Sequence, residues 1–378
     1  MTALFSEAEM RRRRAAFGTV LERGGVSYAL VHGANRSGSA VSWLTGWPVT
    51  REALLVAGRE QDEDVLLVAF FNHVPQARRL SAVRVEWAGS GAMATALALI
   101  RARGRLPGRI GLVGGLPFGE YRLLAEQIPD VVDLNAAYAG LRLVKSAEEM
   151  AALRRGAALS DAAIAALAQA LRPGATDHEV LARTEHAYVA QGGLHHIHYL
   201  GLTAMDEPGL SVPAQWPTGR VISRRDVATC EISAAAAPEY AGQVLRTFTV
   251  GAPPTALYAE LHAVAAATFD AVAQKLVPGT RAGELAAAAA VIEEAGFTGI
   301  DDLVHGFGGG YLAPVVPAPG RPVTEPDFTL AAGMTVVVQP NVVTHDGRAG
   351  VQTGELLQVT GEGPRRLHAF PPGLQQVG

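Results

Sequence analysis

Short apolar runs alternate with helical segments along the first third of the chain. β-branched and aliphatic runs bounded by Gly, Pro or Asp predict strands at residues 26–31, 53–57, 65–71 and 109–113. Helical periodicity is found at residues 93–103 and 119–127, and a Ser6-x-x-Glu9 capping box opens a further helix that stops at Gly24-Gly25. The alternation predicts a three-layer α/β domain.

A second capping box, Ser146-x-x-Glu149, opens an Ala- and Leu-rich helical stretch that extends to about residue 171. The 378 residues suit two domains. We therefore expect a junction near residue 140, with one domain at residues 1–140 and a second at residues 141–378.

The second domain contains an internal repeat. Leu171-Arg172-Pro173-Gly174 followed by Glu179 recurs as Leu276-Val277-Pro278-Gly279 followed by Glu284, with 105 residues between the matching positions. Coincidence is the alternative, because such a sequence commonly ends a helix. The matched spacing favours a duplicated α–α–β unit, whose pseudo-symmetric halves would leave a central cleft for a site.

Composition and charge exclude several classes of protein. The net charge of -4 lacks the basic footprint of a nucleic-acid binder. No apolar run reaches the roughly 18 residues of a membrane span. Cys230 is the only cysteine, which excludes a disulfide framework and a cysteine-based zinc site. Without a recognisable secretory signal, we expect a cytoplasmic protein.

Several polar residues interrupt apolar segments of the second domain. Glu231 lies in the predicted strand 226–232, and Arg246 in the next strand is its candidate ion-pair partner. Taken alone, a structural Glu231–Arg246 pair is favoured over a functional carboxylate. His305 begins a glycine-rich segment that includes Tyr311, and Gln339 ends an apolar strand. Their ordinary alternatives are a turn histidine and a backbone-capping amide.

The order of these segments resembles the pita-bread peptidases, which include Xaa-Pro aminopeptidase, prolidase, methionine aminopeptidase and creatinase. Residues 40–46, AVSWLTG, are similar to the Y-L-T-G element of that family. Residues 141–149 are similar to its L-R-x-V-K-S-x-x-E junction. The resemblance implies a pseudo-symmetric pita-bread carboxy-terminal domain. It also implies a homodimer whose active site lies near the partner's amino-terminal domain.

Metallopeptidases of this family hold two divalent ions with Asp, Asp, His, Glu and Glu. Carried over, these ligands fall on Glu231, Gln243, His305, Gln339 and Gly354, and Glu355 is adjacent to the last. The two catalytic histidines fall on Leu312 and near Ala214. Amides and a glycine replace three carboxylates, so the resemblance is to a branch with a degenerate metal site. We expect no metal cofactor, and one divalent metal is the lesser alternative.

Residues 195–199, HHIHY, lie where the family context places a strand beside the pocket. Strict alternation would turn His196 and His198 to one face and His195 and Tyr199 to the other. The paired histidines could bind metal, act as a base, or lie in solvent. The family context favours His198 as an acid/base residue.

The leading prediction is a metal-independent enzyme that hydrolyses a carbon–nitrogen bond of a small amino-acid-like or amide substrate, as creatinase does. The predicted catalytic residues are Glu231, His305 and His198. The predicted substrate-binding residues are Gln243, Gln339, Tyr311, Arg246, His196 and Glu355. The alternatives are an Xaa-Pro dipeptidase or aminopeptidase with a reduced metal site, a lyase or cyclase, and a non-catalytic pseudo-enzyme. The expected partner is a small molecule, with no role for nucleic acid or membrane.

Overall fold

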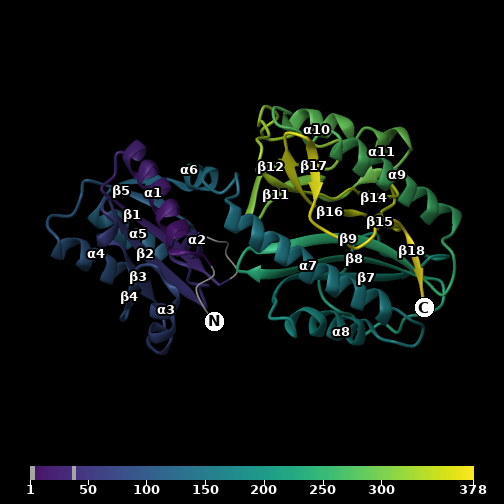
Figure 1. Cartoon of the computed structure of the whole chain (residues 1–378), viewed down its shortest axis with the longest axis horizontal. Helices are drawn as coiled ribbons and strands as arrows, with labels where there is room; N and C mark the ends of the chain where they lie inside the picture. The colour runs from purple at the N-terminus through teal and green to yellow at the C-terminus, as the bar shows by residue number, and fades with distance from the viewer. Residues whose placement is uncertain (1–4, 36–39) are drawn as a thin grey trace. The chain divides into compact units, whose positions relative to one another are not determined.

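The computed structural model describes residues 5–35 and 40–378. The chain divides into two compact units, Met1–Arg142 and Leu143–Gly378. In Figure 1 the first unit runs from purple to blue and the second from teal to yellow. Each unit is built around its own sheets and its own clusters of buried apolar side chains.

Unit 1 is a mixed six-stranded sheet within the described residues, in the order β4-β3-β2-β1-β5-β6. β1 pairs antiparallel with β2, and β2 with β3, while the outer pairs are parallel. The strands are β1 (Tyr28–Ala34), β2 (Glu52–Gly58), β3 (Val65–Val68), β4 (Arg84–Trp87), β5 (Arg109–Val113) and β6 (Asp130–Asp133).

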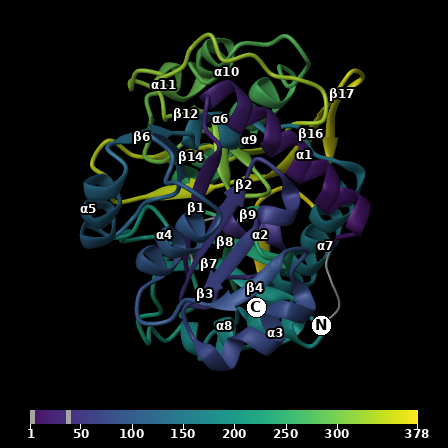
Figure 2. The same cartoon turned by 90° about the vertical axis from the view of Figure 1, so that its left-hand side faces the viewer.

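Helices cover both faces of this sheet, because its central strands are apolar on both sides. Ala29 and Val31 of β1 pack with one set of helices, whereas Leu30 packs with the other. Figure 2 shows the two sets on opposite sides of the strands. The first set is α1 (Glu7–Gly24), α2 (Ala40–Thr45), α3 (Val74–Leu80) and α6 (Asn135–Gly140), and the second is α4 (Ala92–Ala102) and α5 (Phe118–Gln127). The predicted three-layer α/β arrangement is confirmed.

Unit 2 is built on a long sheet with the strand order β12-β11-β13-β16-β9-β8-β7. Its strands are β7 (Leu194–Ala204), β8 (Asp226–Ala237), β9 (Tyr240–Val250), β11 (Val304–Phe307), β12 (Tyr311–Val316), β13 (Thr335–Val338) and β16 (Gly354–Thr360). β17 (Gly363–Arg366) pairs with β16, and β18 (Gln375–Val377) with β9. A small second sheet joins β10 (Thr298–Gly299), β14 (Asn341–Val343) and β15 (Gly350–Gln352).

The helices of unit 2 form two groups. α7 (Ala147–Ala170) and α8 (Asp177–Val189) pack on β7, β8 and β9. α9 (Ala256–Ala273), α10 (Ala282–Ala288) and α11 (Val291–Glu294) belong to the other half (Figure 1). No helix within the described residues is both long enough and apolar enough to cross a membrane.

The internal repeat is visible in the backbone of unit 2. Gly174 and Gly279 both have positive φ, of 88° and 95°. Their amides donate to Ile222 and Leu330, each over 2.9 Å. The next turn repeats as well, since Thr176 and Arg281 occupy corresponding positions in isolated bridges to Val221 and Thr329. The two halves of unit 2 thus share a local design, which confirms the predicted pseudo-symmetric pita-bread fold.

Two apolar segments near the end of the chain are each divided between the two sheets of unit 2. The segment 350–360 is divided at Thr353 into β15 and β16, which belong to different sheets. The segment 333–341 is likewise divided, because β13 ends at Val338 and β14 begins at Asn341. Pro340 has no amide to donate, which suits a break between two sheets.

Candidate active site

A buried cluster of three polar side chains lies across β8, β9 and the end of β13. The Gln243 Nε2 donates to Oε1 of Glu231 over 3.0 Å and to Oε1 of Gln339 over 2.8 Å. Glu231 and Gln243 share one face of the sheet, since Glu231 is opposite Leu245 and Gln243 opposite Ser233 in the antiparallel register. The structure therefore brings together three of the predicted site residues.

His305 joins this cluster from β11. Its side chain is buried, and its Nδ1 lies 3.3 Å from the carbonyl oxygen of Gly306. His305 is opposite Val337 in the antiparallel register, which places it on the same face as Gln339 two residues further on. The Tyr311 ring stacks on it at a centroid distance of 4.1 Å, and the Tyr311 hydroxyl donates to Asp302. Tyr311 is itself more than half exposed, at 54%. A buried imidazole is thus covered by an aromatic ring that solvent can reach.

Burial changes the protonation of both ionisable groups in the cluster. Burial, and secondarily the negative charge of Asp301, raise the pKa of Glu231 from 4.5 to about 8. Burial lowers the pKa of His305 from 6.5 to about 4, and this exceeds the opposing effect of its hydrogen bonds. Near neutral pH the cluster therefore holds a protonated carboxyl and a neutral imidazole.

Sequence reasoning missed three polar residues beside the cluster. Asp301 and Asp302 lie one residue before β11, the strand of His305, and Asn341 donates to Asp301 over 3.1 Å. Asp301 acts on Glu231 through charge, and Asp302 holds Tyr311. The signal in the sequence was the Asp-Asp pair three residues before His305, which has no role in the family's ligand pattern.

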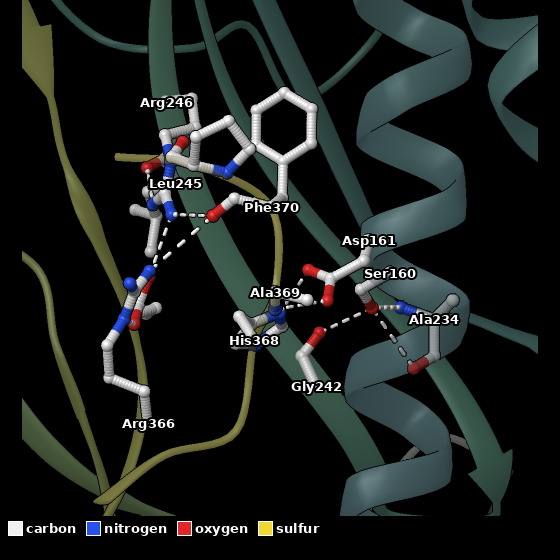
Figure 3. A network of polar contacts seen from close by, with 12 residues as sticks. Ser160, Asp161, Ala234, Gly242, Leu245, Arg246, Arg366, His368, Ala369 and Phe370 are labelled. Carbon is white, nitrogen blue, oxygen red and sulfur yellow. Dashed lines mark hydrogen bonds and ion pairs between the residues drawn. The ribbon is translucent and has the colours of Figure 1, made fainter. Parts of the chain in front are cut away.

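Arg246 and Glu355 form a separate network on the other face of the sheet. Arg246 is opposite Cys230 in the register, which turns it away from Glu231. It donates to Glu355 over 2.7 Å and to backbone carbonyls that include Phe370, as Figure 3 shows for Phe370. Arg366 binds the same carboxylate. The predicted Glu231–Arg246 pair is wrong because strand alternation separates the two side chains.

Cys230 is fully buried among apolar side chains, and burial raises the pKa of its thiol to about 12. Its Sγ contacts the carbonyl oxygen of Arg246 at 3.4 Å. Cys230 is therefore a core residue on the face opposite Glu231.

A β-bulge changes the facing of the histidines in β7. The register shifts between His195 and Ile197, so that His195 and His198 lie on one face with ring centroids 4.5 Å apart. His196 instead contacts Phe307, beside His305. The predicted pairing of His196 with His198 is wrong because alternation fails at a bulge.

His198 lies on the opposite side of the sheet from the Glu231 cluster. It is opposite Ile232 in the register, whereas Tyr199 is opposite Glu231. Its side chain is buried against Tyr188, and burial lowers its pKa to about 3. Of the three predicted catalytic residues, the structure therefore brings together only Glu231 and His305.

The five positions that match the family's metal ligands do not fit a dinuclear centre. Such a centre requires several anionic oxygen ligands. Gln243 instead directs an N–H donor at Glu231 and Gln339. At Gly354 an added Cβ would lie 2.3 Å from the carbonyl oxygen of Val338, so this backbone admits no side chain there. Neighbouring Glu355 is held by two arginines.

Comparisons with known proteins agree on the family. The profile of metallopeptidase family M24 matches residues 151–361, which is more than half of the chain. The chain therefore belongs to metallopeptidase family M24.

Curated relatives of the chain are dipeptidases. The probable dipeptidase PepE of Mycobacterium tuberculosis is 29% identical over 238 residues, a match that spans 62% of this chain and 60% of the relative's length. An Xaa-Pro dipeptidase of Lactobacillus delbrueckii subsp. lactis is 26% identical over 253 residues, 66% of this chain and 67% of the relative.

Solved structures share the whole fold. Dipeptidase PepE from Mycobacterium ulcerans covers 99% of both chains at 22% identity with a TM-score of 0.82. An Xaa-Pro dipeptidase from Bacillus anthracis, at 19% identity and a TM-score of 0.80, covers 97% of this chain and 100% of its own. At these identities the likeness shows the fold alone.

Proposed function

We propose that this chain hydrolyses the amide bond of a small dipeptide-like substrate by acid–base chemistry, with Glu231 and His305 as the proton-transfer groups. The observation that carries the proposal is the buried, hydrogen-bonded cluster at the position of the family's metal site, with its pKa values shifted in opposite directions. Opposite shifts of neighbouring ionisable groups are characteristic of acid–base pairs.

The names of the relatives support one substrate class over the other. Both curated relatives are dipeptidases, and one is named for Xaa-Pro substrates. They support the dipeptidase alternative better than the creatinase-like leading prediction. We therefore propose a dipeptide, and specifically an Xaa-Pro dipeptide, as the substrate class.

The chemistry follows from the two protonation states. Neutral His305 accepts a proton from the attacking water as its oxygen bonds to the amide carbon. Protonated Glu231 donates its proton to the nitrogen as the carbon–nitrogen bond breaks, and solvent returns the proton from His305 to Glu231. Gln243 and Gln339 hold the two groups in register and supply hydrogen bonds to the substrate. His196, beside Phe307, is a further candidate for substrate contact.

The test is turnover of Xaa-Pro dipeptides by protein from which metal has been removed by chelation. We expect activity to persist without metal. Its pH profile should be bell-shaped, with limbs near pH 4 and pH 8, because His305 must be neutral and Glu231 protonated. Glu231→Gln should lower kcat by at least about 100-fold. The exposed Glu260→Gln on α9 is the matched control.

Two results would overturn the proposal in different ways. If turnover requires a stoichiometric divalent metal, the proposed dipeptidase activity would stand but the metal-free mechanism would be wrong. Saturable binding of dipeptides without turnover would instead indicate a binding protein. The homodimer expected from the resemblance stays a prediction.

A further inference from the structure

A second group of polar side chains lies between α8 and the start of β7, on the sheet face opposite Glu231. The Glu185 Oε1 lies 3.8 Å from Nδ1 of His195 and 3.8 Å from Nδ1 of His198. One ligand atom from each residue lies within 4.8 Å of the other two. α8 and β7 are neighbours in the fold (Figure 1).

His198 is the buried member of this group. Its side chain is only 2% exposed, and among the described residues neither ring nitrogen has a hydrogen-bond partner. Buried polar atoms normally have partners, and an imidazole without one needs an explanation. The Tyr188 ring stacks on His198 at 5.0 Å and holds it facing Glu185 and His195.

We propose that Glu185, His195 and His198 bind one divalent transition-metal ion of the zinc class. Bonds of roughly 2.0–2.1 Å in a tetrahedral arrangement place ligand atoms about 3.4 Å apart. The two 3.8 Å separations from Glu185 therefore need to close by a few tenths of an ångström, and the ligand nitrogens of the two histidines, which lie within 4.8 Å of each other, by at most about 1.4 Å. Glu185 and His195 are exposed, so that water can complete the fourth position.

The donor set favours particular metals. Two imidazoles and one carboxylate suit Zn²⁺, Co²⁺ and Ni²⁺, whereas Mg²⁺ and Ca²⁺ prefer oxygen ligands. One present contact would have to give way, because the Tyr188 hydroxyl lies 3.4 Å from Nδ1 of His195. The bound ion would link the end of α8 to the start of β7, and this site is separate from the proposed catalytic cluster.

Calorimetric titration of the full chain, stripped with chelator, tests the proposal with Zn²⁺ and with Mg²⁺. We expect one Zn²⁺ per chain and no response to Mg²⁺. Glu185→Gln preserves shape at an exposed position and should weaken Zn²⁺ binding at least about tenfold. His198→Ala should abolish it. His186→Ala, an exposed neighbour on α8, should leave it unchanged.

His305→Ala locates the bound ion. Retention of the Zn²⁺ in His305→Ala together with its loss in His198→Ala supports the site. Equal affinity in wild type and Glu185→Gln would overturn the proposal. So would loss of Zn²⁺ in His305→Ala with retention in His198→Ala, because the ion would then lie in the central cluster.

Discussion

At the residue scale, Glu231 shows how surroundings decide what a carboxyl group does. Its neighbours are amide groups, so that burial acts without a nearby cation to offset it. Glu355 is also buried, yet Arg366 and Arg246 counter the effect of burial and lower its pKa. Two buried glutamates of one sheet are thereby prepared for different roles, one for proton transfer and one for an ion pair.

The raised pKa of Glu231 predicts a dependence of stability on pH. Because the folded protein holds this proton more tightly, the contribution is complete below pH 4.5 and is lost as pH rises toward about 8. Wild type should therefore lose stability relative to Glu231→Gln across this window, with a slope approaching ~1.4 kcal/mol per pH unit. Urea unfolding of both proteins at pH 5, 6.5 and 8 measures it. If the difference in free energy of unfolding between wild type and Glu231→Gln does not change with pH, Glu231 has an ordinary pKa.

At the element scale, the chain after β17 is held against α7. Asp161 accepts from the His368 Nδ1 over 2.8 Å and from the Ala369 backbone over 2.6 Å, as Figure 3 shows. The preceding residue of the same helix, Ser160, is hydrogen-bonded to the backbone of Ala234 and Gly242. α7 thus links the two central strands to the carboxy-terminal segment.

This link predicts the effect of removing Asp161. Burial opposes ionisation, but the contacts with His368 and with the backbone of Ala369 and Phe370 together outweigh it and lower the pKa of Asp161. The contribution of Asp161 to stability is therefore present above pH 3.8 and lost in acid. Asp161→Ala should lower the free energy of unfolding by about 1–3 kcal/mol at pH 7. Urea denaturation measures this loss. Arg154→Ala, exposed on the same helix, is the control, and equal stability of the two variants would contradict the role.

The boundaries of helices and strands could be predicted from the sequence where a single local signal marks them. The capping box at Ser146 placed the start of α7 to the residue, because a side-chain cap is a local device. The β7 bulge was not predictable, since an extra residue in a strand leaves no mark on its pattern of apolar positions. The division of 350–360 between two sheets also depends on pairing partners distant in the chain.

At the scale of the whole molecule, the clusters of buried apolar side chains belong to one unit or the other. A unit with its own core should fold alone. We expect a fragment of residues 143–378 to fold and to unfold cooperatively. Its far-UV circular dichroism spectrum should show the helix and strand content of unit 2. Urea transitions that differ between near-UV and far-UV circular dichroism would contradict this, because they show that tertiary packing and secondary structure are lost separately.

The sequence by itself determined the family, the layered first unit, the duplicated second unit and the positions of Glu231, Gln243, His305 and Gln339. The family and the site positions follow from the resemblance of ordered motifs to those of the pita-bread peptidases, and the layered elements follow from periodicity. Only the tertiary structure decided that Arg246 pairs with Glu355, that His198 faces α8, and that Gly354 leaves no room for a side chain. The physical reason is that register, bulges and close backbone contacts arise between segments far apart in sequence, where no local pattern records them.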